Sequence, residues 1–403
     1  MTIVKTILAQ MPAVRQPQVK FLDTLFATIL ALRGHVNFRN LSRYCDYSER
    51  TIQRQFRTSF DWATFHRLTL QTVLGVADEW IEVQDASFVP KSGKLTPGLG
   101  SFFNGCAGRP ERGLEISTLA WVNVTRGYAV TRHVAQTPAT TKAHGDESRL
   151  VWYAQQVVQQ RPTLPAQVKY LVVDGAYAKR SYLDAVVTDQ HHVITKLRCD
   201  ADCYFLPTAP RVPGQKGRPR KYDGKVNFQD LARFTCLGPL ADEAHVTVYT
   251  AVVWHKRFGR KLRLVVLVNR KDPQKPRYIV LATTAVELDA DTVVRYYRAR
   301  FQIEFLFRDA KQFTGLTDCQ ARDAAALDFH FNAALATLNL VRVSEVQAAD
   351  THPLPVFSVA RWKQQKFNER LVETIITKLD LEPTLIKNHP RYEEIRTYGA
   401  IAA

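Results

Sequence analysis

The run QVKYLVVDGAY at residues 167–177 sets the fold, because a continuous apolar stretch that stops at an Asp-Gly pair is typical of a central, buried strand. The pattern predicts that this strand ends at Asp174. A helix over 177–188 and the strand HHVITKLR at 191–198 are expected to follow it. This alternation of strand and helix indicates an α/β protein.

Strand patterns also precede this run. EWIEVQDASF at 79–88 predicts a strand that ends with Asp85 and runs into a loop rich in Gly and Lys. Two further strands are expected at 115–124 and 127–135, with a hairpin turn at Gly127. A helix is predicted over roughly residues 146–160.

Residues 199–288 interrupt the alternation with a basic Pro/Gly loop, VPGQKGRPRKYDGK, and three runs of strand character. Those runs are HVTVYTAVVW, KLRLVVLVN and RYIVLATT. They predict a mostly β insertion. Helical periodicity resumes over 289–313, continues to about 343, and is followed by a helical, basic tail from about 346.

The N-terminal part is expected to be a pair of helices that reads DNA. FLDTLFATILALRG at 21–34 predicts an apolar helix closed by Gly34. Farther on, the break at 45–47 precedes Ser48, which is expected to cap a second helix carrying Arg50 and Arg54. This is the layout of a helix-turn-helix, whose second helix enters the major groove. The alternative is a solvated helical pair with no partner.

Charge supports a nucleic-acid partner. Lys and Arg number 55 against 38 Asp and Glu, which gives a net charge of +17 and a field that attracts polyanions. No stretch reaches the ~20 apolar residues of a membrane span, and the N-terminus lacks a signal-peptide pattern. We therefore expect a cytoplasmic protein with no membrane contact.

The six cysteines are scattered and are expected to be reduced in that compartment. Cys199 and Cys203 are close in sequence, but no second close pair or matching His pair completes a zinc set. No structural zinc and no small-molecule cofactor are predicted.

Asp85 and Asp174 are candidate metal ligands. Each stands where an apolar strand is predicted to give way to a loop, and strand ends are favoured ligand positions in α/β sheets. Carboxylates from distant segments are the ligands that Mg²⁺ prefers, and phosphoryl transfer on DNA relies on such cations. An Asp after a strand is also a common turn or capping residue, which is the alternative for each.

The helix predicted over 289–313 carries a polar face. Tyr297, Arg300, Glu304 and Lys311 fall within an arc of roughly 60° at 100° per residue. The apolar residues gather mainly on another side: Ala299, Ile303, Leu306, Phe307 and Ala310. The polar face is either part of a site or an ordinary solvated surface.

The spacing of these four polar residues resembles the YREK signature of DDE transposases of bacterial insertion sequences, insertion sequence family four. The order Asp85, Asp174, β insertion and Glu304 resembles members whose ribonuclease-H-like core is interrupted by a β domain. The resemblance covers roughly residues 78–340.

The resemblance implies cut-and-paste transposition, with Asp85, Asp174 and Glu304 as catalytic residues that bind Mg²⁺, which Mn²⁺ can replace. Arg300 and Lys311 would hold phosphate oxygens, and Tyr297 a phosphate near the transferred strand. The partners would be the terminal inverted repeats and target DNA, bound by a homodimer.

In similar enzymes an aromatic side chain holds a flipped base of a DNA hairpin, and Trp254 is the candidate here; the alternative is a core tryptophan. The segment Lys216–Lys221 resembles the core of an AT-hook, with Arg218 and Arg220 as DNA contacts. Its alternative is a mobile basic loop that contacts phosphates non-specifically.

The predicted domain plan places a helical DNA-binding region first and a helical tail last, with the catalytic core divided by the insertion. Its boundaries are 1–77 for the DNA-binding region, 78–198 and 289–345 for the core, 199–288 for the insertion and 346–403 for the tail. Two other functions share these features: a metal-dependent nuclease that cleaves without joining strands, and a catalytically inactive DNA-binding regulator.

Overall fold

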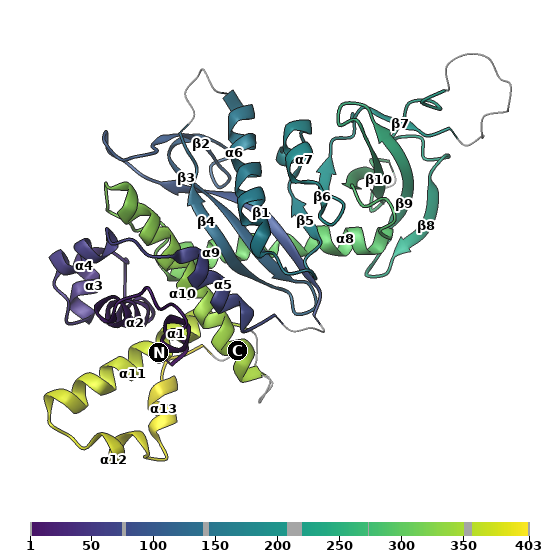
Figure 1. Ribbon diagram of the computed structural model, residues 1–403. Coiled ribbons are helices and arrows are strands. Elements are labelled where there is room, and N and C mark those ends of the chain that lie inside the picture. The colour runs from purple at the N-terminus through teal and green to yellow at the C-terminus, as the bar shows by residue number, and fades with distance from the viewer. Residues whose placement is uncertain are drawn as a thin grey trace.

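A computed structural model describes residues 2–74, 78–139, 145–207, 220–272, 274–349 and 357–401. Within these ranges, eleven strands form one mixed sheet with helices on both faces (Figure 1). The strands are β1 (Trp80–Pro90), β2 (Gly100–Asn104), β3 (Arg109–Asn123), β4 (Tyr128–Gln136), β5 (Tyr170–Val173), β6 (His192–Leu197), β7 (Cys203–Phe205), β8 (Thr235–Leu240), β9 (Glu243–His255), β10 (Arg260–Asn269) and β11 (Arg277–Thr283).

The helices lie in three groups along the chain. They are α1 (Thr2–Ala9), α2 (Gln16–Ala31), α3 (Phe38–Tyr44), α4 (Glu49–Phe56) and α5 (Trp62–Gln71), then α6 (Gly145–Gln160) and α7 (Arg180–Val186), then α8 (Ala290–Ala299), α9 (Gln302–Phe313), α10 (Ala324–Ala349), α11 (Val359–Lys378), α12 (Pro383–Lys387) and α13 (Tyr392–Thr397). Short 3₁₀ turns follow α6 and β5. The mixture of strands and helices confirms the predicted α/β class.

The sheet runs in the order β2-β3-β1-β5-β6-β11-β10-β9-β7, with β4 added beside β3 and β8 beside β9. β1, β5 and β6 are mutually parallel, and the pairs on either side of them are antiparallel. The predicted hairpin forms between β3 and β4, and Gly127 adopts the positive φ of +68° that its turn requires.

The strands of residues 199–288 extend the central sheet rather than forming a sheet of their own. β11 pairs antiparallel with β6, so that Val280 lies opposite Leu197 and Thr283 opposite Ile194. The segment predicted as a mostly β insertion is joined to the central sheet by this pairing. Backbone hydrogen bonding is therefore continuous from β1 to β9.

Helices cover the two faces of the sheet differently. α6 and α7 pack on one face with Tyr182, Leu183 and Val186 fully buried. α8, α9 and α10 cover the other face, where the predicted apolar residues Ile303, Leu306, Phe307 and Ala310 are buried and Ala299 is partly buried. The carboxylate site lies on this second face.

The N-terminal helices pack against α10 (Figure 1). The predicted capping residue Ser48 accepts a hydrogen bond from the Thr51 N–H and begins α4. α4 buries Ile52 and Phe56, and the Phe56 ring lies 4.6 Å from that of Phe329 on α10. The structure adds α1, which the sequence pattern did not indicate.

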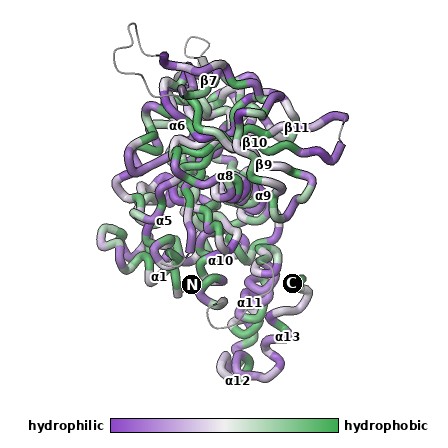
Figure 2. Tube along the Cα trace, turned by 90° about the vertical axis from the view of Figure 1, so that its right-hand side faces the viewer, coloured by the Kyte–Doolittle hydropathy of each residue, from purple (hydrophilic) through white to green (hydrophobic). Residues whose placement is uncertain are grey.

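The tail is helical, as predicted, but α10 continues through the expected boundary at 345 as far as Ala349. α11–α13 lie at the opposite end of the molecule from β7 in both views (Figures 1 and 2). Among the described residues, no helix is long and apolar enough to cross a membrane.

Candidate active site

Two of the predicted carboxylates are brought side by side by the parallel strands. β1 and β5 pair as far as Gln84 and Val173, so Asp85 and Asp174 are the next residues on neighbouring strands. Asp174 follows the last residue of β5, as predicted. Asp85 does not end its strand, because β3 keeps pairing with β1 from Asp85 opposite Thr118 to Pro90 opposite Gly113.

The helix predicted over 289–313 is broken in two at Arg300 and Phe301. The N–H groups of Phe301, Ile303 and Glu304 bond to carbonyls three residues back, which tightens the turn as in a 3₁₀ helix. Tyr297 therefore belongs to α8 and Glu304 to α9. Tyr297 and Arg300 nevertheless reach the carboxylates of the sheet, and Arg300 pairs with Glu304 four residues on.

At this break, the Arg300 side chain contacts one carboxylate from the sheet and one from α9. Its guanidinium donates to Asp85 Oδ2 at 3.2 Å and to Glu304 Oε1 at 3.1 Å. The Tyr297 hydroxyl donates to Asp174 Oδ1 at 3.4 Å. The three carboxylates thus come together around one arginine and one tyrosine, although the first and the last of them are 219 residues apart in sequence.

Burial dominates the electrostatics of this cluster. Burial raises the pKa of Asp85 to about 6, which the Arg300 charge and the Ala86 N–H oppose and the Asp174 and Glu304 charges reinforce. Burial likewise raises the pKa of Tyr297 to about 12. A carboxyl group with such a pKa is stabilised in its charged form by additional positive charge.

Carboxylate oxygens suit a hard cation, but the carboxylates of Asp85, Asp174 and Glu304 are not close enough together to form a metal site in this structure. Among the described residues, no three His, Cys, Asp or Glu side chains are close enough to hold a metal ion. Arg300 instead supplies the positive charge between Asp85 and Glu304. Glu304 is 42% exposed and lies in the first turn of α9.

Two other predicted site residues lie away from this cluster. Lys311 is seven residues beyond Glu304, about 10 Å along α9, and makes no ion pair with the three carboxylates. Its partial burial lowers its pKa. Trp254 lies on β9, four strands from β5 and thus about 19 Å across the sheet. It is partly exposed, with the Lys221 ammonium 4.8 Å from its ring.

The basic residues predicted to contact DNA from the N-terminal region and from the basic Pro/Gly loop also lie apart from the carboxylates. Arg50 and Arg54 are exposed on α4, on the side away from the buried Ile52. Arg220 is exposed and pairs with Asp223 at 3.4 Å. Arg218 lies outside the described residues.

The structure adds side chains that the sequence reading missed. Lys196 is exposed on β6 and follows Thr195, which pairs with Val173, so it stands beside Asp174. Phe301, just before α9, and Phe305, on α9, flank Glu304 in sequence; they are 48% and 37% exposed and form an edge-to-face pair with centroids 5.1 Å apart. The signal available in the sequence was the pair Phe301 and Phe305, two aromatic residues at helical spacing on either side of Glu304.

Gly175 explains how Asp174 and β6 approach so closely. A Cβ atom at this position would lie 3.0 Å from the Lys196 carbonyl oxygen. A larger residue here would require β6 to shift by a few tenths of an ångström, so glycine suits the close approach of the two strands.

Asp85 and Asp174, placed where the parallel pairing of β1 and β5 stops, and Glu304 from α9 give this α/β protein an acidic site. Residues 13–261 match the family described as DDE superfamily endonuclease, which is more than half of the 403 residues. The chain belongs to this family. The match includes Asp85 and Asp174 and ends before Glu304.

Comparison with solved structures and curated sequences adds little. The piggyBac transposase in a synaptic complex with hairpin DNA is similar at 11% sequence identity and a TM-score of 0.47, covering 97% of this chain and 77% of that chain. No curated protein sequence matches the chain.

Proposed function

We propose that this protein is a DNA transposase of an insertion sequence, cutting the element's ends and joining them to target DNA. The observation that carries the proposal is the meeting of Asp85, Asp174 and Glu304 around Arg300. Membership of the DDE superfamily endonucleases and the net charge of +17 support it. Under this proposal the strands β4-β3-β1-β5-β6 are a ribonuclease-H-like core.

The three carboxylates would bind Mg²⁺ or Mn²⁺, which would activate the attacking oxygen and stabilise the leaving one. The chain's own residues would prepare the site. Arg300 would leave its carboxylate partners for a DNA phosphate, and its buried Nε, which has no acceptor among the described residues, is a further donor for that phosphate. Tyr297 would hold Asp174 in place through its hydroxyl.

Other basic and aromatic side chains would contact DNA outside the carboxylates. Lys196, Phe301 and Phe305 border the cluster, and the aromatic rings are exposed to stack on unpaired bases. Arg50 and Arg54 on α4 would read the terminal inverted repeat. More remote contacts proposed from the sequence are Lys311, Trp254, Arg218 and Arg220.

Synapsis of two ends would require two copies of the chain on DNA. A homodimer is therefore proposed for the complex that cuts and joins, in the cytoplasm of a bacterial cell.

Glu304→Gln tests the proposal. The substitution keeps the side chain's shape and removes the charge that a hard cation needs. We expect folding and DNA binding to survive while Mg²⁺-dependent nicking of end DNA collapses. Normal nicking by Glu304→Gln, or undiminished cleavage in EDTA, would show that the carboxylate cluster is not the active site.

A nuclease that cleaves without joining is the second candidate, and the family's own description as endonucleases favours it. The two functions share the carboxylates and differ in the fate of the free 3′-hydroxyl. Incubating precut end DNA with a supercoiled plasmid separates them, because only a transposase produces joined products.

A further inference from the structure

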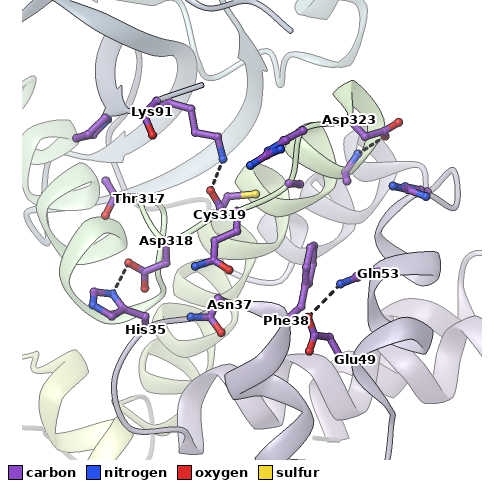
Figure 3. Close-up of a pocket in the computed structure, with 17 residues that line it drawn as sticks. His35, Asn37, Phe38, Glu49, Gln53, Lys91, Thr317, Asp318, Cys319 and Asp323 are labelled. Carbon is purple, nitrogen blue, oxygen red and sulfur yellow. Dashed lines mark hydrogen bonds and ion pairs between the residues drawn. The ribbon is translucent and has the colours of Figure 1, made fainter. Parts of the chain in front are cut away.

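A polar cleft of about 830 Å³ opens between the N-terminal helices and the sheet, apart from the carboxylate cluster (Figure 3). One wall is formed by residues 35–38 and by α4. The other is formed by the end of β1 at Pro90–Ser92 and by the segment 317–323 between α9 and α10. The cleft therefore joins the helix predicted to read DNA to the strand that carries Asp85.

α4 presents two polar faces, and one of them lines this cleft. Glu49, Gln53 and Arg57 are spaced by four residues and share the face toward the cleft. Arg50 and Arg54 lie on a different face and do not line it. A nucleic acid read by the outer face of α4 would pass close to the inner face as well.

The acidic side chains of the cleft are already engaged within the protein. Asp318 accepts from the His35 ring at 2.9 Å and from the Val36 N–H at 2.7 Å. Asp323 accepts from the Ala326 N–H at 3.1 Å. Glu49 accepts from the Gln53 amide at 3.1 Å. Figure 3 shows the pairs of Asp318 with His35 and of Glu49 with Gln53 at the walls of the cleft.

Several donors have no such partner. Arg57, Arg322 and Gln320 are exposed to the cleft, and their side chains form no hydrogen bond or ion pair with the residues that the structure describes. Lys91 adds a partly buried positive charge, held by its bond to the Cys319 carbonyl (Figure 3). Unpaired guanidinium groups around a cleft suit a ligand that carries phosphate oxygens.

The distance to the carboxylates matches a short length of DNA. Lys91 directly follows the extended strand β1 and lies six residues after Asp85, which is about 20 Å at ~3.3 Å per residue. A DNA strand advances ~3.4 Å per nucleotide, so the same span is about six nucleotides. One strand can therefore reach from the carboxylates to the cleft.

We propose that this cleft binds the sugar-phosphate backbone of one DNA strand, about six nucleotides from the phosphodiester at Asp85, Asp174 and Glu304. The inference rests on the proposed function, because it takes DNA as the ligand. Arg57 and Arg322 contact the phosphates from opposite walls, and the partly exposed ring of Phe38 packs against the sugars. The cleft thereby fixes the separation between the site that reads the end and the site that cuts it.

The experiment measures DNA binding without cutting. In a Glu304→Gln background, Arg57→Ala and Arg322→Ala are compared by fluorescence anisotropy on a duplex taken from the terminal repeat that brackets the gene. Each is expected to weaken binding roughly tenfold and to reduce the dependence of log Kd on log salt by about one unit. Arg322→Lys should recover most of the salt dependence. The control Arg391→Ala removes an equally exposed arginine on the far C-terminal region and should change Kd by less than about twofold.

Neutral methylphosphonates placed along one strand then locate the contact. A substitution about six nucleotides from the cut should weaken binding of the parent and leave Arg322→Ala unaffected. If both arginine variants bind with the parent's affinity and salt dependence, the cleft does not hold DNA. If, in that case, the chain that retains Glu304 still binds the duplex and nicks it with Mg²⁺, the proposed function stands while the cleft inference falls. A parent that does not bind the duplex at all overturns both.

Discussion

Arg300→Gln tests two proposed roles of the Arg300 side chain: it competes with a divalent cation for the carboxylates, and it contacts a DNA phosphate. The guanidinium bridges Asp85 and Glu304 at 3.2 and 3.1 Å, so it supplies positive charge where a divalent cation would otherwise act. A cation that binds these carboxylates must first compete with the guanidinium. Removing the charge should therefore tighten cation binding to the protein in the absence of DNA.

The size of the effect follows from the exposure of the partners. A hydrogen bond to a charged group contributes ~1.5–3 kcal/mol when buried. Arg300 is 13% exposed and Asp85 23%, whereas Glu304 is 42% exposed and its bond is weakened by solvent. A net cost of about 1–2 kcal/mol for displacing the guanidinium corresponds to a gain of roughly 5- to 30-fold in cation affinity.

Electron paramagnetic resonance of Mn²⁺ counts bound ion directly and needs neither DNA nor turnover. Arg298→Gln is the matched control, because Arg298 is a neighbouring arginine whose partners, Asp242 and Glu243, lie away from the site. Tighter Mn²⁺ binding is expected for Arg300→Gln alone, together with slower nicking because a phosphate contact is lost. Unchanged or weaker Mn²⁺ binding would refute the competition between guanidinium and cation.

Three further predictions test the packing and the electrostatics. Leu306→Ala removes a side chain that is 6% exposed beneath α9 and should lower the free energy of unfolding by ~2–5 kcal/mol in a urea titration, without changing the affinity for Mn²⁺. Burial lowers the pKa of His66 to about 4, so the ring stays neutral in the folded protein. The neutral ring therefore does not destabilise the fold above the unfolded pKa of 6.5, and protonation of the unfolded chain lowers the free energy of unfolding below it. His66 should account for about 2 kcal/mol of the stability lost between about pH 7.5 and pH 5, and His66→Gln should reduce the loss by that amount; an equally large loss in the variant would assign the acid sensitivity elsewhere. Phe301→Ala should weaken binding of end DNA with unpaired bases by ~1–3 kcal/mol relative to a fully paired duplex, and an equal effect on both substrates would exclude stacking.

Much of the site could be predicted from local sequence pattern. The apolar run before Asp174 marks a buried strand and its end, and the structure ends β5 at Val173. The apolar spacing around Glu304 correctly predicts that Ile303, Leu306 and Phe307 are buried. Both patterns depend on neighbours in sequence and on a fixed period, so they can be recognised without the tertiary structure. The capping role of Ser48 is local in the same sense.

The predicted end of β1 failed for a reason outside the local pattern. Asp85 is where pairing with β5 ceases, but β3 continues to pair for five more residues, up to Pro90. A strand's length is decided by the partners available on both sides, and those partners come from distant parts of the chain. The joining of β6 to β11 has the same origin, because a cross-strand pair between residues 197 and 280 has no signal in either segment alone.

The sequence by itself determined the α/β class, the strand ending at Asp174, the cap of α4 and the buried face beneath Glu304. Tertiary structure decided the rest. Arg300 contacts both Asp85 and Glu304 where α8 gives way to α9, and the contact with Asp85 spans 215 residues, so it cannot be read from a helical period. The cleft beside α4 exists only because β1, α4 and the segment 317–323 meet in space. Contacts between segments far apart in the chain are set by packing the sheet and helices together, and that packing is a property of the whole chain.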